Sequence, residues 1–299
     1  MADSTAHLRR KIGSASDLHA VVRAMKAQAA ASVGQYAQSV AALGDYARTV
    51  ELGLGACFRQ EPLMPRPHAA APAERRIRAV VFGSDQGLVG RFNDTLVEHA
   101  LPTLSAQAAT PAITQVWAVG SRMQSSLADA DIPMQGSFTV PATVKGITRL
   151  VTDILVAVID TAPASQEPEN PPELHLFYNR PTGGAGYSPV SQRLLPLDDA
   201  WRLELAQRPW PTAMLPERLG SAAETLRALI NEFVFVSIYR ASAESLASEN
   251  ASRLAAMDRA DRNIDKMLLE LQERFHRLRQ SKIDEELSDV IAGFKALSE

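Results

Sequence analysis

The sequence has 299 residues with 31 basic and 34 acidic side chains, and its formal net charge of −3 gives no case for nucleic-acid binding through bulk electrostatics. A single cysteine, Cys57, excludes an internal disulfide and fits a reducing cytosol, so we expect it to be a small buried apolar residue. The sequence shows no signal peptide and no apolar run of about eighteen residues, which predicts a soluble protein that can still sit on a membrane complex.

The first segment, 1–61, predicts one long helix, because no proline occurs before Pro62. Only His19 and Lys26 are polar in a row that alternates steps of four and three residues, as a coiled-coil seam does. A helix of this length would measure roughly 80 Å. We interpret Gly53-Leu54-Gly55 as its termination. The row comprises Leu8, Ile12, Ala15, His19, Val22, Lys26, Ala29, Val33, Tyr36, Val40, Leu43, Ala47, Val50 and Leu54.

The middle section predicts an open, Rossmann-like α/β domain over 75–212, after a proline-rich linker over 62–74. Strands alternate with helices there, and 201–216 is interpreted as turns. The expected strands are 77–83, 113–120, 135–140, and a pair at 173–179 and 192–197 joined by a flexible hairpin at Gly183, Gly184 and Gly186; the expected helices are 93–107, which Pro102 ends or bends, 121–128 and 147–161.

The last segment, 213–299, predicts a second long helix, since no proline follows Pro216. Two seams with a change of phase between them run along it. We expect the two long helices to pair antiparallel, because the chain must leave and return through the middle section. The alternative is two separate amphipathic helices packed on a globular core. The seams comprise Ile264, Leu268, Leu271, Phe275 and Leu278, then Ile283, Leu287, Val290, Phe294 and Leu297.

The stretch Ser84–Asn93 lies between a predicted strand and a predicted helix, where a phosphate-binding turn would sit. Its glycine spacing is not that of a dinucleotide fingerprint, and no Lys-Ser or Lys-Thr pair follows it. The pattern therefore favours a structural turn over a phosphate site.

No catalytic constellation, cofactor site or metal site is predicted, because the six histidines are scattered without metal-ligand spacing. The acidic run 284–286 is interpreted as a solvated face. A basic cluster on the closing helix is either a solvated surface as well, or a belt facing acidic surfaces of a partner that encircles the helix. It consists of Arg274, Arg277, Arg279 and Lys282.

Several motifs together resemble the gamma subunit of F-type ATP synthases, and the resemblance spans essentially the whole chain. The most specific is the run from Leu246 to Met257 on the closing helix; the others are Arg279-Gln280, Ile283, Glu286-Leu287 and Gly293, the turn Ser84–Asn93, and more thinly Arg10-Lys11-Ile12, Ser14 and Arg23 to Lys26. Departures from the family pattern at Ala27-Gln28, Gln86, Val89, Arg91, Asp284 and Phe294 indicate a divergent or alternative member.

The resemblance implies an antiparallel coiled coil with a central α/β domain, acting as the rotor shaft of a proton- or sodium-transporting ATP synthase. Rotation of the membrane ring would be coupled to conformational change at the beta-subunit catalytic sites during ATP synthesis or hydrolysis. The implied partners are the alpha and beta subunits, the epsilon subunit and the membrane rotor ring. No nucleic acid, cofactor, direct small-molecule substrate or catalytic site is implied. The implied location is peripheral, on the cytoplasmic face of the plasma membrane.

At matching positions, the resemblance implies contacts with the beta subunits at Met25, Arg279 and Gln280. A possible basic belt consists of Arg274, Arg277 and Lys282. An antiparallel register that brings Met25 level with Gln280 also puts Leu8 beside Leu297. Two rival functions stay open. One is a coiled-coil adaptor with a ligand-binding α/β domain, and the other is an enzyme that uses Ser84–Asn93 for phosphate chemistry.

Overall fold

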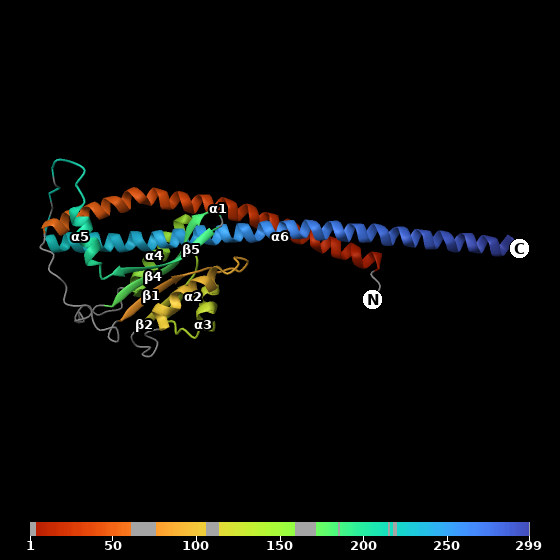
Figure 1. Ribbon diagram of the computed structural model, residues 1–299, viewed down its shortest axis with the longest axis horizontal. Coiled ribbons are helices and arrows are strands. Elements are labelled where there is room, and N and C mark those ends of the chain that lie inside the picture. The colour runs from red at the N-terminus through yellow and green to blue at the C-terminus, as the bar shows by residue number, and fades with distance from the viewer. Residues whose placement is uncertain are drawn as a thin grey trace. The chain divides into compact units, whose positions relative to one another are not determined.

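The structure is a computed structural model that describes residues 4–60, 76–105, 114–158, 172–184, 186–214, 216–217 and 220–298. It divides into two compact units. One comprises residues 30–252, and the other comprises residues 1–29 together with 253–299. Two long helices, α1 (Thr5–Gln60) and α6 (Ala222–Ser298), contribute to both units (Figure 1).

Helices α1 and α6 pack against each other antiparallel within each unit, as the sequence predicts. In the unit of the chain ends, Lys26 of α1 bonds to Asp258 of α6 at 2.7 Å. In the other unit, the Tyr46 hydroxyl donates to Glu232 at 2.7 Å. Within the unit of the chain ends, His19 lies 3.3 Å from Asp265 while Lys26 bonds to Asp258. Within the other unit, a Cβ on Gly53 would lie 3.1 Å from the Leu229 side chain while Tyr46 bonds to Glu232. In each unit the position numbers rise along α1 while those of their partners fall along α6, which defines the antiparallel direction. The alternative of two separate helices packed on a globular core is therefore wrong.

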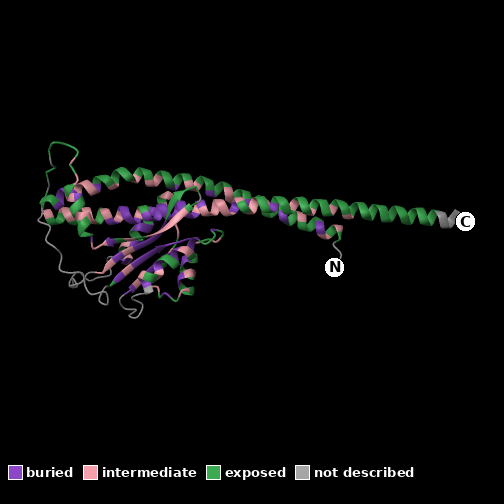
Figure 2. Ribbon diagram, in the orientation of Figure 1, coloured by how far each residue is buried: buried purple, intermediate pink, exposed green. Residues whose placement is uncertain are grey.

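The predicted seam of α1 is confirmed, because all fourteen of its positions are buried or half-buried (Figure 2). Leu8, Ala29 and Leu54 are among the most buried residues of the helix. The first seam of α6 is confirmed as well, since Ile264 is buried and Leu268, Leu271, Phe275 and Leu278 are half-buried.

The predicted register between the two helices is wrong. Met25 packs in a cluster with Met257 and Ile264, so it is level with Met257 and not with Gln280. The guanidinium of Arg9 lies 5.8 Å from the centroid of the Phe275 ring, which places the start of α1 beside that part of α6. The seam spacing fixes which faces meet, but any slip by whole heptads preserves the same faces.

The second seam of α6 is not buried by α1, which has 56 residues where α6 has 77, although its first residue, Ile283, borders a groove shared with the start of α1. Four predicted seam residues are instead exposed: Ile283 at 52%, Leu287 at 57%, Val290 at 69% and Phe294 at 74%. The side chain of Leu297 lies outside the described residues. We call residues 283–294 the unpaired segment of α6.

The central sheet has five strands in the order β3-β2-β1-β4-β5. Its first four strands run parallel, and β5 runs antiparallel to β4 through the predicted hairpin, where Gly183 faces Gly186. Both hairpin strands are longer than predicted. The strands are β1 (Ile77–Phe82), β2 (Thr114–Val119), β3 (Gly136–Phe138), β4 (Glu173–Gly183) and β5 (Gly186–Leu195).

Helices cover both faces of this sheet (Figure 1). One face packs against α2 (Phe92–Ser105) and α3 (Ser121–Asp129), and the other packs against α4 (Val144–Val158) and α6. Helix α2 continues past Pro102 to Ser105. Tyr36 of α1 joins the core on the α4 and α6 side, so the first long helix is also anchored to the domain.

Two predictions around the end of α1 are wrong. Residues 201–216, expected as turns, include most of a helix, α5 (Asp199–Gln207). The two glycines Gly53 and Gly55 lie inside α1 and do not end it. A Cβ on Gly55 would lie 2.5 Å from the Leu205 carbonyl oxygen of α5, so the glycine permits a close helix contact. Cys57, in the same turn, is buried as expected.

No helix among the described residues combines the length and the apolar character that a membrane crossing requires.

Replacing Gly55 by Ala should destabilise the 30–252 unit by about 1–3 kcal/mol, because the new methyl group would collide with backbone that cannot rotate away. The matched change Gly44→Ala meets no atom within 4 Å and should stabilise α1 by about 0.5–1 kcal/mol. Urea unfolding followed by circular dichroism measures both. A Gly55→Ala variant at least as stable as Gly44→Ala would contradict the close-contact interpretation.

Candidate functional site

The turn Ser84–Asn93 is closed by its own hydrogen bonds. The Ser84 backbone N–H donates to Asn93 Oδ1 at 3.1 Å, and Asn93 Nδ2 donates to Ser84 Oγ at 2.9 Å. Ser84 is fully buried. Leu88 and Gly90 both adopt positive φ, of 63° and 62°. These bonds form a structural turn between β1 and α2.

A carboxylate occupies the place that a phosphate would take in this sheet. Asp85 accepts from the Ser121 backbone N–H at 2.8 Å, at the first residue of α3, and from the Val140 N–H at 2.9 Å. A helix N-terminus beyond the carboxyl ends of parallel strands is where α/β folds bind anionic ligands. The protein's own anion fills it, so the turn offers these donors to no phosphate.

Two of the motifs that carry the family resemblance contact each other. Ser252 of α6 donates its hydroxyl hydrogen to the Val89 carbonyl oxygen in the turn at 2.6 Å. One turn of helix earlier, Ser248 donates to the Asn179 carbonyl oxygen of β4 at 3.0 Å. Both serines belong to the run 246–257, which sequence reasoning flagged by resemblance without a role. Their hydroxyl groups fix α6 to the carboxyl ends of the central strands.

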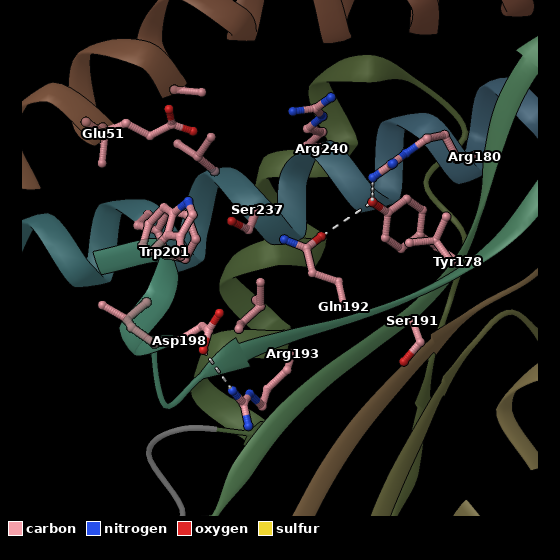
Figure 3. A pocket seen from close by; sticks show the side chains of 17 residues that line it. Glu51, Tyr178, Arg180, Ser191, Gln192, Arg193, Asp198, Trp201, Ser237 and Arg240 are labelled. Atoms are coloured by element: carbon pink, nitrogen blue, oxygen red, sulfur yellow. Dashed lines mark hydrogen bonds and ion pairs between the residues drawn. The ribbon is translucent and has the colours of Figure 1, made fainter. Parts of the chain in front are cut away.

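A cavity of about 410 Å³ opens between α1, β5, α5 and α6 (Figure 3). Glu244, which is 5% exposed, accepts from Arg180 at 2.9 Å and from Arg240 at 2.7 Å. Arg180 also donates to the Tyr178 hydroxyl at 2.6 Å. Burial is the largest single influence and lowers the pKa of Arg180, but the interactions with Glu244 and Tyr178 together outweigh it, so that pKa is raised. The net shift keeps Arg180 charged.

The other charged groups around this cavity also face partners. Arg193 lies 3.8 Å from Asp198, and Glu51 accepts from Arg208 at 2.7 Å. These pairs join β4 to α6, β5 to the residue before α5, and α1 to the residue after α5. The cavity therefore gives no specific support to the adaptor hypothesis, which needs a site with unused binding groups.

The two polar positions of the α1 seam find acidic partners on α6. Lys26 donates to Asp258 at 2.7 Å and to Asp261 at 3.0 Å. His19 lies 2.8 Å from the other oxygen of Asp261 and 3.3 Å from Asp265. Hydrogen bonds from Lys26 lower the pKa of both Asp258 and Asp261, and the same contacts raise the pKa of Lys26. Sequence spacing revealed the polar positions of α1 but not these partners.

The residues carried over as beta-subunit contacts are not gathered in one place. Met25 is half-buried in the seam beside Met257, whereas Arg279 and Gln280 are exposed on α6. From Met257 to Gln280 the helix rises by about 35 Å. Met25 therefore contributes to the packing of the two helices, whereas Arg279 and Gln280 present an exposed surface.

The basic belt is exposed and partly paired within α6. Arg277 lies 3.9 Å from Glu273, and Lys282 lies 3.8 Å from Glu286, each one helical turn away. Arg274 is exposed too. Arg279 and Lys282 line a groove of about 260 Å³, which also contains Arg9, Phe275 and Glu286. Such exposed pairs contribute little to stability, so most of this charge is available for contact with a partner.

Comparison with known proteins agrees with this architecture. The family described as ATP synthase matches residues 4–297. A relative named ATP synthase gamma chain from Syntrophus aciditrophicus is 31% identical over 243 residues, which cover 78% of this chain and 77% of the relative. The chain belongs to the ATP synthase gamma-chain family. A gamma chain from Anaeromyxobacter sp. is 25% identical over 299 residues, covering 97% and 98% of the two chains.

Solved structures show the same fold. A chain in the Euglena gracilis mitochondrial ATP synthase, in the structure of OSCP, F1 and c-ring, aligns with a TM-score of 0.61 at 15% identity, over 98% of this chain and 94% of that one. A chain of the Tetrahymena thermophila central stalk and c-ring aligns with a TM-score of 0.53 at 21% identity, over 80% and 99%. As a gamma chain, the protein is the rotor shaft of an ATP synthase and a subunit of that enzyme complex.

Replacing Asp85 by Ala should destabilise the sheet domain by about 1–3 kcal/mol, because two backbone N–H groups lose a charged acceptor. Asp85→Asn keeps one acceptor oxygen and should cost less. Chemical denaturation of the purified chain measures both effects. The structural role would be refuted if Asp85→Ala left stability unchanged and created phosphate binding.

The cluster around Lys26 should make helix pairing sensitive to pH. A carboxyl whose pKa is lowered on folding stabilises the folded state above its unfolded value of about 3.9, and this contribution disappears as pH falls through the folded value. A lysine whose pKa is raised contributes fully below about 10.4 and loses its contribution as pH rises further. The stability difference between the native chain and Lys26→Met should be present at neutral pH and vanish at strongly acidic pH.

Urea midpoints measured by circular dichroism at both pH values test this. The control Lys282→Met removes a lysine whose nearest acid is 3.8 Å away and exposed, and it should leave the midpoint unchanged at neutral pH. An equal Lys26→Met effect at neutral and acidic pH would contradict the assignment.

Proposed function

We propose that the unpaired segment of α6 occupies the bore of the ring of alpha and beta subunits, and that its contacts there couple rotation to the catalytic cycle. One observation carries the proposal: α6 continues past the start of α1 at Thr5, and an apolar row on this part of α6 is exposed. Exposed rows of large apolar side chains mark surfaces that a partner covers. A ring that encircles the helix would cover it from every side.

Coupling through such a segment needs no chemistry within the shaft. A rotor can change the populations of alternative beta conformations only if its contacts differ between them. A single helix with an apolar row on one side and acidic residues at 284–286 and 289 presents a different surface to each of three surrounding subunits. The proposed role therefore rests on asymmetry, with ATP bound and converted in the beta subunits alone.

Arg279 and Gln280 are proposed as polar contacts with the levers of the beta subunits. Both are exposed immediately before the unpaired segment, and Arg279 lines the groove with Arg9 and Lys282. This positive groove is suited to acidic side chains of a partner. Met25 contributes indirectly, by packing against Met257 and bracing α6 from the α1 side.

The α/β domain is proposed to dock on the epsilon subunit and the membrane rotor ring, which would place the protein peripherally at the cytoplasmic face of the plasma membrane. Its support is the serine contacts that join this domain to α6. Torque delivered to the domain would pass into the helix through them. The coupled ion, a proton or sodium, would be selected by the membrane subunits.

Arg279→Ala with Gln280→Ala should lower ATP hydrolysis and ion pumping of the assembled complex several-fold, because each truncation removes a polar contact that changes during rotation. The measurement is steady-state ATPase activity together with ion uptake into vesicles. Arg149→Ala is the matched control, because Arg149 is 89% exposed on α4 and is not one of the proposed beta-subunit contacts. Unchanged activity of the double variant in a fully assembled complex would show that the assigned contacts are wrong.

A further inference from the structure

One cluster of side chains at the α1–α6 seam has the composition of a metal site. His19 of α1 faces Asp261 and Asp265, which are four residues apart and therefore share one face of α6. Their nearest ligand atoms all lie within 4.8 Å of one another. We propose that His19, Asp261 and Asp265 bind a divalent transition-metal ion, of which Zn²⁺ is the representative, and that the ion clamps α1 to α6.

The distances from His19 to the two carboxylates are close to those around a tetrahedral ion. Zinc bonds of about 2.0–2.2 Å place neighbouring ligands roughly 3.3–3.6 Å apart in a tetrahedron. His19 Nε2 lies 3.3 Å from Asp265 Oδ1, which already matches that edge. The 2.8 Å distance to Asp261 Oδ1 is that of a hydrogen bond, and it would open by about half an ångström when an ion replaces the shared proton. Three protein ligands leave one position for water.

The burial of the three proposed ligands also suits an ion that exchanges with solvent. The side chains of His19 and Asp261 are 18% and 17% exposed, while that of Asp265 is 59% exposed. Two ligands are therefore held by the packing of the helices, and the third borders solvent, where an ion can enter. The exposed position accommodates the water ligand.

The charges around the cluster attract a cation, and they are nearly balanced when no ion is bound. Lys26 occupies the second oxygen of Asp261 and also bonds to Asp258, which pairs in addition with Arg262 at 3.0 Å. Three carboxylates thus face two permanent cations, which leaves one negative charge when His19 is neutral. Lys26 holds Asp261 so that its Oδ1 is directed to His19.

The ligand types select the class of ion. An imidazole nitrogen suits Zn²⁺, Cu²⁺, Ni²⁺ and Co²⁺, whereas Mg²⁺ and Ca²⁺ prefer shells of oxygen alone. The site joins the two ends of the chain, 242 residues apart in sequence. An ion that binds only when both helices are in register stabilises that register, as any ligand specific for the folded state does.

The experiment uses the full-length chain without a histidine tag, stripped with a chelator. Isothermal titration with Zn²⁺ should show one site of micromolar or tighter affinity, and Co²⁺ should give the visible absorption of a tetrahedral complex. Zn²⁺ should raise the unfolding temperature, and millimolar Mg²⁺ should not reproduce the effect. His19→Gln keeps a hydrogen-bonding side chain and should weaken Zn²⁺ binding by at least about ten-fold, as should Asp265→Asn.

Two controls separate this site from other metal-binding groups. Glu273→Gln alters an exposed ion pair with Arg277 elsewhere on α6 but no proposed ligand, and His175→Ala removes the histidine that bonds to Glu173 at 2.8 Å on β4. Both should keep Zn²⁺ affinity within about two-fold. Absence of binding at micromolar Zn²⁺ would overturn the proposal, leaving the cluster as a hydrogen-bonded ion pair only. Unchanged binding by a folded His19→Gln variant would overturn it as well.

Discussion

The structure depends on the close attachment of α6 to the sheet through small side chains. Ala241, Ala243 and Ala247 are buried there, and Ser245 and Ser248 direct their hydroxyl groups to backbone carbonyls of the strands. Larger residues would hold the helix axis farther from the sheet, and apolar ones would leave those carbonyls without donors. This contact makes the helix part of the domain core, and the same continuous helix supplies the surface for α1.

Two different interactions hold the long helices together. In the 30–252 unit they share an apolar core with the sheet and α5, to which Tyr36, Val50 and Leu54 contribute. In the unit of the chain ends there is no sheet, and the helices rely on a narrow apolar seam with polar contacts at His19 and Lys26. Polar pairs at seam positions cost stability relative to apolar ones, but they define a single register. The polar residues therefore supply specificity where the core is smallest.

The sequence predicted the fold class, the seam of α1 and the order of the strands and helices apart from α5, because each depends on local periodicity. It did not predict the register, since alternating steps of four and three remain in phase after a slip by heptads. It also misassigned Gly53 and Gly55, because a glycine that ends a helix and one that admits a neighbouring backbone look alike in sequence. The role of Gly55 depends on Leu205, which is far along the chain.

The candidate sites, too, were predictable from the sequence only where they depend on one local stretch of the chain. The structural interpretation of Ser84–Asn93 followed from glycine spacing, whereas the carboxylate of Asp85 that fills the anion position became visible only with Ser121 and Val140 beside it. The exposure of Arg279 and Gln280 agrees with their expected surface position, and their contact with beta subunits stays a prediction. Spacing within one helix could not reveal a cluster whose members come from α1 and α6.

The pairing of the first helix with the last also constrains biosynthesis. His19 leaves the ribosome long before Asp261, and at 5–20 residues per second the interval is roughly 10 to 50 s. Throughout that time the apolar face of the early helix around His19 lacks the α6 residues that cover it in the folded protein. The two long helices can therefore finish pairing only after the last part of the chain has been synthesised, even if the sheet folds earlier.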